Sequence, residues 1–249
     1  MQDLNPAPGG RAAELRDRLA AVRHRIAAAS ADAARPEPAL IVVTKYFPAS
    51  DVRILSGLGI LDVGENRDQE AAPKAEETSD CRLHWHFIGQ LQTNKAKSVV
   101  RYADAVHSVD RVSLVNALAK GWAAENEHRE QRGEHPRDPL SCFVQVNLDE
   151  AAADARGGAS PGLIEELAVR IAGAPGLALA GVMAVAPLGA DPLTSFRRLG
   201  DLAAAVRAVD VRATGMSAGM SADLEAAIAA GATHLRIGSD VLGPRPPLR

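Results

Sequence analysis

The chain has 249 residues, of which 47% are hydrophobic and 24% charged, and its formal net charge is −3. This composition is typical of a globular protein with a sizeable core, and it lacks the basic excess of nucleic-acid-binding proteins. The N-terminal residues contain no apolar region of the kind found in signal peptides, and prolines and glycines interrupt the longest uncharged stretch, 171–190. We therefore expect a cytoplasmic protein that binds neither nucleic acid nor membrane, with Cys81 and Cys142 as free thiols.

Helical and strand-like patterns alternate along the chain. An amphipathic helix is predicted at 11–29, with an apolar face formed by Leu15, Leu19, Val22 and Ile26. Eight strand-like runs follow, at 39–46, 60–65, 83–89, 104–109, 141–148, 177–186, 212–219 and 234–242.

Helices are predicted between most of these strands. One begins at Ser160 and Pro161, and another spans 221–231 with Ser221 as its N-cap and Gly231 at its end. The charged segment 125–139 and the small-residue segment 151–160 lack apolar periodicity and are expected to be loops.

This alternation predicts a parallel sheet, and the count of eight strands favours a closed (β/α)8 barrel. We expect one domain over residues 1–249, with loose ends at about 1–10 and 244–249. A doubly wound open sheet is the competing fold, but no GxGxxG motif follows the first strand. In a barrel, functional side chains gather at the C-terminal ends of the strands.

Lys45 follows the apolar run "LIVV" at the end of the first predicted strand. Lysines are rare here, and the others lie in polar sequence at Lys74, Lys95, Lys97 and Lys120. Lys45 is either a surface lysine with a buried stem or a reactive amine in an apolar surround.

The ends of the last two strands suggest a phosphate site. Ser217, Ser221 and Ser239 supply hydroxyls, and Gly219 and Gly238 allow close backbone approach. Alternatively, Ser221 is only an N-cap and the glycines only form turns.

Charged and imidazole groups also occur on predicted strands. Arg236 should point into the barrel, where its partner is either a ligand or a carboxylate such as Glu65 or Asp62. A separate group of imidazoles on the third and fourth strands could bind zinc, as in a barrel hydrolase, and consists of His84, His86 and His107.

From about residue 11 to 243, the sequence resembles the pyridoxal-phosphate homeostasis protein family. The resemblance lies in the ordered motifs "VTKYFPAS", "VGEN", "WHFIGQLQTNK", "HSVDR", "VQVNLDE", "GVMAVAP" and "GMSADLEAAIAAGATHLRIG". It implies a (β/α)8 barrel like the N-terminal domain of alanine racemases, without their C-terminal β-domain, and it implies pyridoxal 5′-phosphate as the cofactor.

The resemblance also implies roles for individual residues. Lys45 would form the Schiff base, and Arg236 would face the pyridine nitrogen. Asn66 and His86 would line the pocket. The phosphate would be held by Ser221, Gly238 and Ser239, with help from Ser217. Neither a catalytic residue nor a metal ligand is implied.

The sequence departs from the family pattern in several places. Arg67 and Asp68 replace a common tyrosine and a small apolar residue, and Ser239 and Asp240 replace threonine and alanine. Ser239 keeps the hydroxyl, whereas Asp240 adds a negative charge. Ala155-Arg156-Gly157 replaces a more usual Lys-x-Gly.

The function implied by the resemblance is a non-catalytic carrier in vitamin B6 and amino-acid homeostasis. We expect a monomer that binds pyridoxal phosphate and transiently meets apo-enzymes that depend on it. The alternative is a related racemase or decarboxylase. Racemisation needs a second base, and none is evident in the sequence. Tyr46 is expected on the opposite strand face from Lys45, and Tyr102 is expected to lie away from the site.

Overall fold

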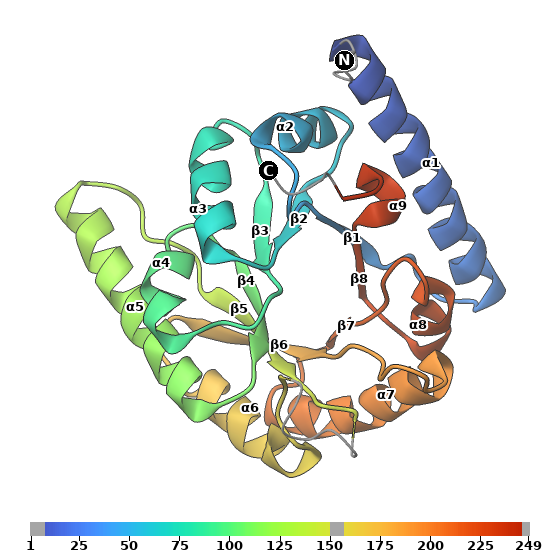
Figure 1. The fold of residues 1–249 in the computed structure, drawn as a ribbon. Coiled ribbons are helices and arrows are strands. Elements are labelled where there is room, and N and C mark those ends of the chain that lie inside the picture. The colour runs from blue at the N-terminus through green and yellow to red at the C-terminus, as the bar shows by residue number, and fades with distance from the viewer. Residues whose placement is uncertain (1–7, 150–156, 246–249) are drawn as a thin grey trace.

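The computed structural model describes residues 8–149 and 157–245, and within them eight parallel strands form a closed barrel (Figure 1). Each strand pairs with its neighbours in chain order, and β1 also pairs with β8. The strands are β1 Ala39–Val43, β2 Asp62–Glu65, β3 His84–Phe87, β4 Ala105–Val109, β5 Leu140–Gln145, β6 Leu177–Met183, β7 Gly215–Ser217 and β8 His234–Ile237. The predicted barrel is confirmed, although several strands are shorter than expected.

Helices surround the barrel on its outside (Figure 1). They are α1 Pro8–Asp32, α2 Ala49–Gly57, α3 Asp68–Glu77, α4 Ala96–Val99, α5 Val112–Gln131, α6 Ile164–Ala172, α7 Pro192–Val209, α8 Leu224–Ala230 and α9 Ser239–Leu242. Short 3₁₀ turns precede α4 and α6, at Thr93–Lys95 and Pro161–Leu163. Ser160 and Pro161 begin the second of these turns, close to the predicted helix start.

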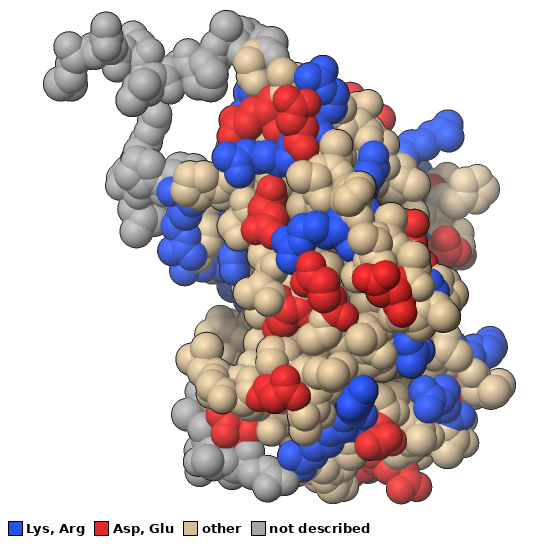
Figure 2. Space-filling view, turned by 90° about the vertical axis from the view of Figure 1, so that its right-hand side faces the viewer, with Lys and Arg blue, Asp and Glu red and all other residues tan. Residues whose placement is uncertain are grey.

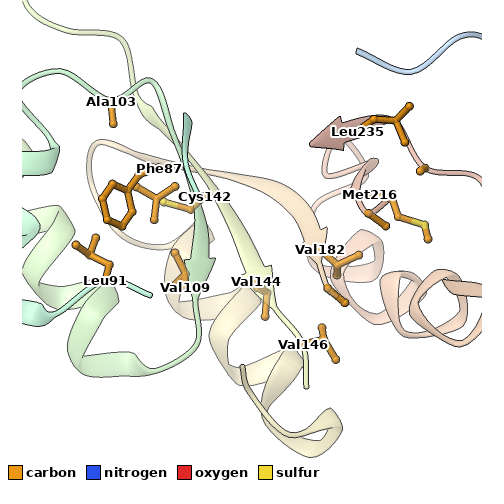
Figure 3. Packing of buried hydrophobic residues seen from close by; sticks show 14 of the residues in the cluster. Phe87, Leu91, Ala103, Val109, Cys142, Val144, Val146, Val182, Met216 and Leu235 are labelled. Carbon is orange, nitrogen blue, oxygen red and sulfur yellow. The ribbon is translucent and has the colours of Figure 1, made fainter. Parts of the chain in front are cut away.

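Alternate strand residues face outward and form the main core. Phe87, Val144, Val182 and Leu235 belong to one buried cluster between the strands and the helices (Figure 3). The inward-facing residues form a much smaller apolar cluster. It contains Ala105, Phe143 and Met183, with a half-buried alanine packed against them. The interior also holds buried polar side chains, namely His86, His107, Ser217 and Arg236.

The N-terminal helix α1 lies across the outside of the barrel beside α8 and α9 (Figure 1). Its predicted apolar face is buried: Leu15, Leu19, Val22 and Ile26 are at most 3% exposed. Arg11 links α1 to α2 through a 2.6 Å ion pair with Asp51. The first helix thus joins elements from both ends of the chain.

One predicted loop is wrong in part. Residues 125–131 form the last turns of α5, and the chain leaves the helix only after Gln131. The segment lacks an apolar stripe because most of it faces solvent, while its one buried side chain, Glu125, lies 3.5 Å from Arg132 and 3.8 Å from Arg101. Charge pairing therefore stabilises a helix that apolar periodicity does not reveal.

Residues 151–156 of the other predicted loop lie outside the described residues, as do Ala155 and Arg156. Ala159 forms a parallel bridge with Val146 at the end of β5.

Acidic and basic side chains are interspersed on the face that carries α1 (Figure 2). In the described ranges, no helix is both long and apolar enough to cross a membrane.

Candidate cofactor site

A cavity of about 490 Å³ opens at the C-terminal ends of the barrel strands. Its walls come from the segments that follow β1, β2, β3, β6, β7 and β8. Six of the eight predicted site residues line it: Lys45, Asn66, Ser221, Arg236, Gly238 and Ser239. Ser217 and His86 are buried inside the barrel and are not part of this lining.

Lys45 stands in a turn directly after β1. It is the one lysine on the cavity wall among the described residues, and its amine makes no hydrogen bond with any of them. The turn is fixed from the side of α3, where Lys74 Nζ donates to the backbone oxygen of Thr44 at 2.9 Å. The backbone on which Lys45 stands is therefore held, while its amine remains available to a ligand.

Lys74 also forms a 2.6 Å ion pair with Glu65 at the end of β2, and Thr44 Oγ1 donates to the same carboxylate oxygen at 2.7 Å. Burial raises the pKa of Glu65 above its usual value, although the neighbouring ammonium acts in the opposite direction. Sequence reasoning missed this buried cluster, because Lys74 lies in a polar helical segment that suggests solvent exposure.

Tyr46 corrects one prediction. It lines the same cavity as Lys45, with its ring centroid 5.9 Å from Lys45 Nζ, instead of pointing to the opposite face. Strand alternation ends at Val43, and Tyr46 has a φ of 71°, which is uncommon for a residue with a side chain. Its N–H donates to Glu70 Oε2 of α3 at 3.1 Å, which helps to hold this turn.

Two hydroxyls meet on the part of the wall that follows β7 and β8. Ser221 Oγ and Ser239 Oγ are 3.4 Å apart, although they come from the loop after β7 and the start of α9. Ser221 is not the N-cap of α8 as predicted, because that helix starts at Leu224 and Asp223 instead accepts the Met220 N–H. The Ser221 hydroxyl is therefore not used by helix capping.

Gly219 makes the path of this loop possible. Its φ is 91°, and a side chain there would place Cβ 2.6 Å from Cβ of Ala227 in α8. Gly231 ends α8 in the left-handed conformation, which confirms the predicted helix end.

Asp240 is neutralised by Arg25 of α1. Arg25 Nη1 lies 2.7 Å from Asp240, and its other nitrogens bind Glu225 and the backbone oxygen of Ser221. This arginine, which sequence reasoning missed, both fixes the serine loop and offsets the negative charge that Asp240 adds. Its position in the amphipathic helix gave no sign of a contact with the site.

Arg236 is buried at the cavity floor, as its strand parity predicts. Its Nη1 donates to Ser217 Oγ at 2.7 Å and its Nη2 to the backbone oxygen of Ala184 at 2.9 Å. Glu65 and Asp62, the two carboxylates considered as partners, are engaged elsewhere. Burial lowers the pKa of Arg236 to about 10, so the guanidinium remains charged at neutral pH.

The three candidate zinc ligands do not converge on one point. His86 Nδ1 and His107 Nε2 are hydrogen-bonded to each other at 2.9 Å, whereas His84 is exposed and lies against Asp62. Within the described ranges, no group of three or more histidine, cysteine, aspartate or glutamate side chains has the arrangement of a metal site. The described part of the chain therefore gives the zinc hydrolase alternative no donor set.

Asn66 contributes an open hydrogen-bonding position, because its Oδ1 is buried without a partner among the described residues. The backbone at Asn66 passes so close to Gly89 that a Cβ there would lie 2.1 Å from the Asn66 carbonyl oxygen. A primary amine, two adjacent hydroxyls, an open amide and a buried cation thus surround one cavity. This donor set fits an aldehyde that also carries a phosphate and a basic ring nitrogen.

The C-terminal segment also reaches the cavity. Arg245, expected in a loose end, has its guanidinium 3.8 Å from the ring centroid of Tyr46, and Arg67 lies 5.7 Å from the same ring. Asp68, which like Arg67 departs from the family pattern, is 3.9 Å from Lys95. Tyr102 lies outside this cavity, against Asp68, and burial raises its pKa.

Comparisons with known proteins agree with the fold. Residues 18–246 match the model of the alanine racemase N-terminal domain. The chain is 42% identical to a pyridoxal phosphate homeostasis protein of Mycobacterium tuberculosis, over 98% of this chain and 97% of the relative. The Escherichia coli protein of that name is 33% identical over 91% and 95%. The chain belongs to the family of pyridoxal phosphate homeostasis proteins.

Solved structures lead to the same fold. PipY of Synechococcus elongatus, solved with PLP bound, superposes with a TM-score of 0.76 at 30% identity, over 92% of this chain and all of that one. Alanine racemase from Streptomyces lavendulae has a TM-score of 0.70 at 15% identity and matches over 60% of its own length. The second likeness concerns the barrel alone.

Proposed function

We propose that this chain binds pyridoxal 5′-phosphate in the cavity at the C-terminal end of the barrel and holds its aldehyde on Lys45. The observation that carries this proposal is the Lys45 amine, which faces the cavity without a hydrogen-bond partner in the described part of the chain. The names of the relatives and the PLP-bound PipY support the choice of cofactor.

The cofactor's polar groups have matching partners in the cavity. Ser221, Ser239 and the backbone at Gly238 would hold the phosphate, and Arg236 would face the ring nitrogen. Asn66 would accept a hydrogen bond from a polar group of the ring through its unpartnered Oδ1. Bound pyridoxal phosphate supplies an aldehyde that condenses with amines and a ring that withdraws electrons from them.

The proposed role is to hold and release the cofactor, without efficient chemistry on amino acids. Arg236 does not readily give up a proton, so it leaves the ring nitrogen unprotonated and the ring a weak electron acceptor. A monomer that passes pyridoxal phosphate to apo-enzymes fits this role. Light scattering of the purified protein tests the monomer, and cofactor transfer to an apo-enzyme tests the release.

A racemase or decarboxylase is the second candidate, and the position of Tyr46 favours it. The phenol ring shares the cavity with Lys45, so a second proton-transferring group is present where sequence reasoning expected none.

Borohydride reduction tests the central assignment. After incubation with pyridoxal phosphate and reduction, a pyridoxyl group should be found on the peptide that contains Lys45, and Lys45→Ala should abolish this label. Lys120→Ala is the matched control and should label normally. Stoichiometric label on any other lysine of the wild-type protein would contradict the assignment.

A further inference from the structure

A row of polar side chains runs through the centre of the barrel below the cavity. Arg236 Nη1 is 2.7 Å from Ser217 Oγ, which is 2.9 Å from His107 Nδ1. His107 Nε2 is 2.9 Å from His86 Nδ1, and His86 Nε2 is 3.0 Å from Asp62 Oδ1. These contacts join β8, β7, β4, β3 and β2 across the interior.

The row ends at a second opening. Asp62 and His86 line a cavity of about 410 Å³ whose other residues come mostly from the starts of the strands, so it lies at the opposite end of the barrel from Lys45. The three middle members, Ser217, His107 and His86, are each less than one tenth exposed. Apolar side chains usually fill this space in such barrels.

The donors in this row can point in only one direction if both ends are charged and both imidazoles are neutral. Asp62 is a carboxylate and accepts from His86 Nε2–H, since His86 lowers the pKa of Asp62 despite its partial burial. A neutral His86 then accepts at Nδ1 from His107 Nε2–H, and a neutral His107 accepts at Nδ1 from the Ser217 hydroxyl. Ser217 Oγ in turn accepts from Arg236.

The surroundings of His107 favour this neutral form. Its ring stacks on Phe143 with centroids 4.2 Å apart, and it meets His86 and His234 edge-on. Burial lowers the pKa of His107 well below its usual value, and the charge of Arg236 acts in the same direction.

We propose that Ser217, His107, His86 and Asp62 are positioning residues for Arg236. Their hydrogen bonds hold the guanidinium in one orientation under the cavity, and the Asp62 carboxylate, as the acceptor at the other end of the barrel, fixes the direction of the row. This inference rests on the proposed function, in which Arg236 faces the ring nitrogen of the cofactor. The proposed effect is a preference for ligands with an acceptor nitrogen at that position.

The first test needs no cofactor. Nitrogen-15 spectra of the histidine rings in the ligand-free protein at neutral pH should show both His86 and His107 protonated at Nε2 and bare at Nδ1. A proton on Nδ1 of either ring would break the direction of the chain and overturn the proposal. His86→Gln and His107→Gln identify the two sets of signals.

The second test compares pyridoxal phosphate with an analogue whose ring nitrogen is replaced by carbon. Wild-type protein should bind pyridoxal phosphate more tightly. Asp62→Asn, which removes the charge but keeps an acceptor, and Ser217→Ala should each reduce this preference by about three- to tenfold while analogue affinity stays unchanged. The matched control is Ser108→Ala, because that hydroxyl is buried on β4 without a partner among the described residues.

Each outcome decides the proposal. An equal loss of affinity for both ligands, or an unchanged preference in both variants, means that the row only fills the barrel. A wild-type protein without preference for the nitrogen-containing ring overturns it as well. Absence of label on Lys45 would instead reject the proposed function, whereas the ring spectra of the ligand-free protein would remain valid.

Discussion

Ser221 and Ser239 bring their hydroxyls within 3.4 Å of each other from two separate segments, and neither hydroxyl caps a helix. A hydrogen bond to a charged group contributes roughly 1.5–3 kcal/mol. The double variant Ser221→Ala/Ser239→Ala should therefore weaken binding of pyridoxal phosphate by at least about tenfold.

The comparison ligand is pyridoxal, which lacks the phosphate. Its affinity should change little in the same variant, as measured by titration of the visible absorbance. If both ligands lose affinity to the same extent, the two serines maintain the shape of the loop and do not bind phosphate.

Tyr46 distinguishes the two candidate functions. We expect the protein loaded with pyridoxal phosphate to exchange the α-hydrogen of alanine, ornithine or lysine no faster than the free cofactor, because Arg236 leaves the ring a weak electron acceptor. Deuterium incorporation detected by mass spectrometry measures this exchange whatever the product.

Tyr46→Phe should leave the slow exchange unchanged. Rapid, saturable exchange that is lost in both Tyr46→Phe and Lys45→Ala would instead identify an enzyme with Lys45 and Tyr46 as its two proton-transferring groups.

The helix α1 supports the serine loop through Arg25, which is 2.7 Å from Asp240 and donates to the backbone oxygen of Ser221. Partly exposed ion pairs usually contribute less than about 1 kcal/mol. Arg25→Gln leaves the Asp240 carboxylate uncompensated near the phosphate, so affinity for pyridoxal phosphate should fall by about two- to fivefold.

Asp240→Ala in the same chain should restore most of this affinity, because the repulsive charge is then absent. Arg16→Gln is the control, since among the described residues this α1 side chain is paired only with its exposed neighbour Asp17. A double variant as weak as Arg25→Gln alone would show that Arg25 acts on the loop and not on the charge.

The strands and the position of Lys45 follow from apolar runs, so the sequence predicts them well. The turn after β1 could not be predicted in the same way, because Tyr46 adopts a positive φ that is stabilised by Glu70 from α3. The Lys74–Glu65 pair and the last turns of α5 could not be predicted from the sequence either. Each depends on partners distant in sequence or on charge pairing, and neither leaves a periodic apolar pattern.

The barrel as a whole should lose stability in acid. Burial lowers the pKa of His234 from 6.5 to about 4, and that of His107 also falls well below its usual value. Because the unfolded chain then binds protons more readily, stability is complete above about pH 6.5 and is lost as the pH falls toward the folded-state pKa values. For His234 the difference is on the order of 3 kcal/mol.

Urea unfolding between pH 7.5 and 4.5 measures this dependence. His234→Gln should flatten the profile, whereas His24→Gln, on the exposed face of α1, should leave it unchanged. A free energy of unfolding that stays constant or rises toward pH 4.5 would contradict the assignment of neutral buried histidines.

The packing of α1 against α8 and α9 has a consequence for biosynthesis. The ribosome releases α1 early, but the surface that covers Leu15 and Leu19 is completed only after β8 and α9 have emerged. Until then, Arg25 lacks its partners and the two serines have no fixed relation to Lys45. The cavity proposed for the cofactor can therefore take shape only after the residues of β8 and α9 have been synthesised.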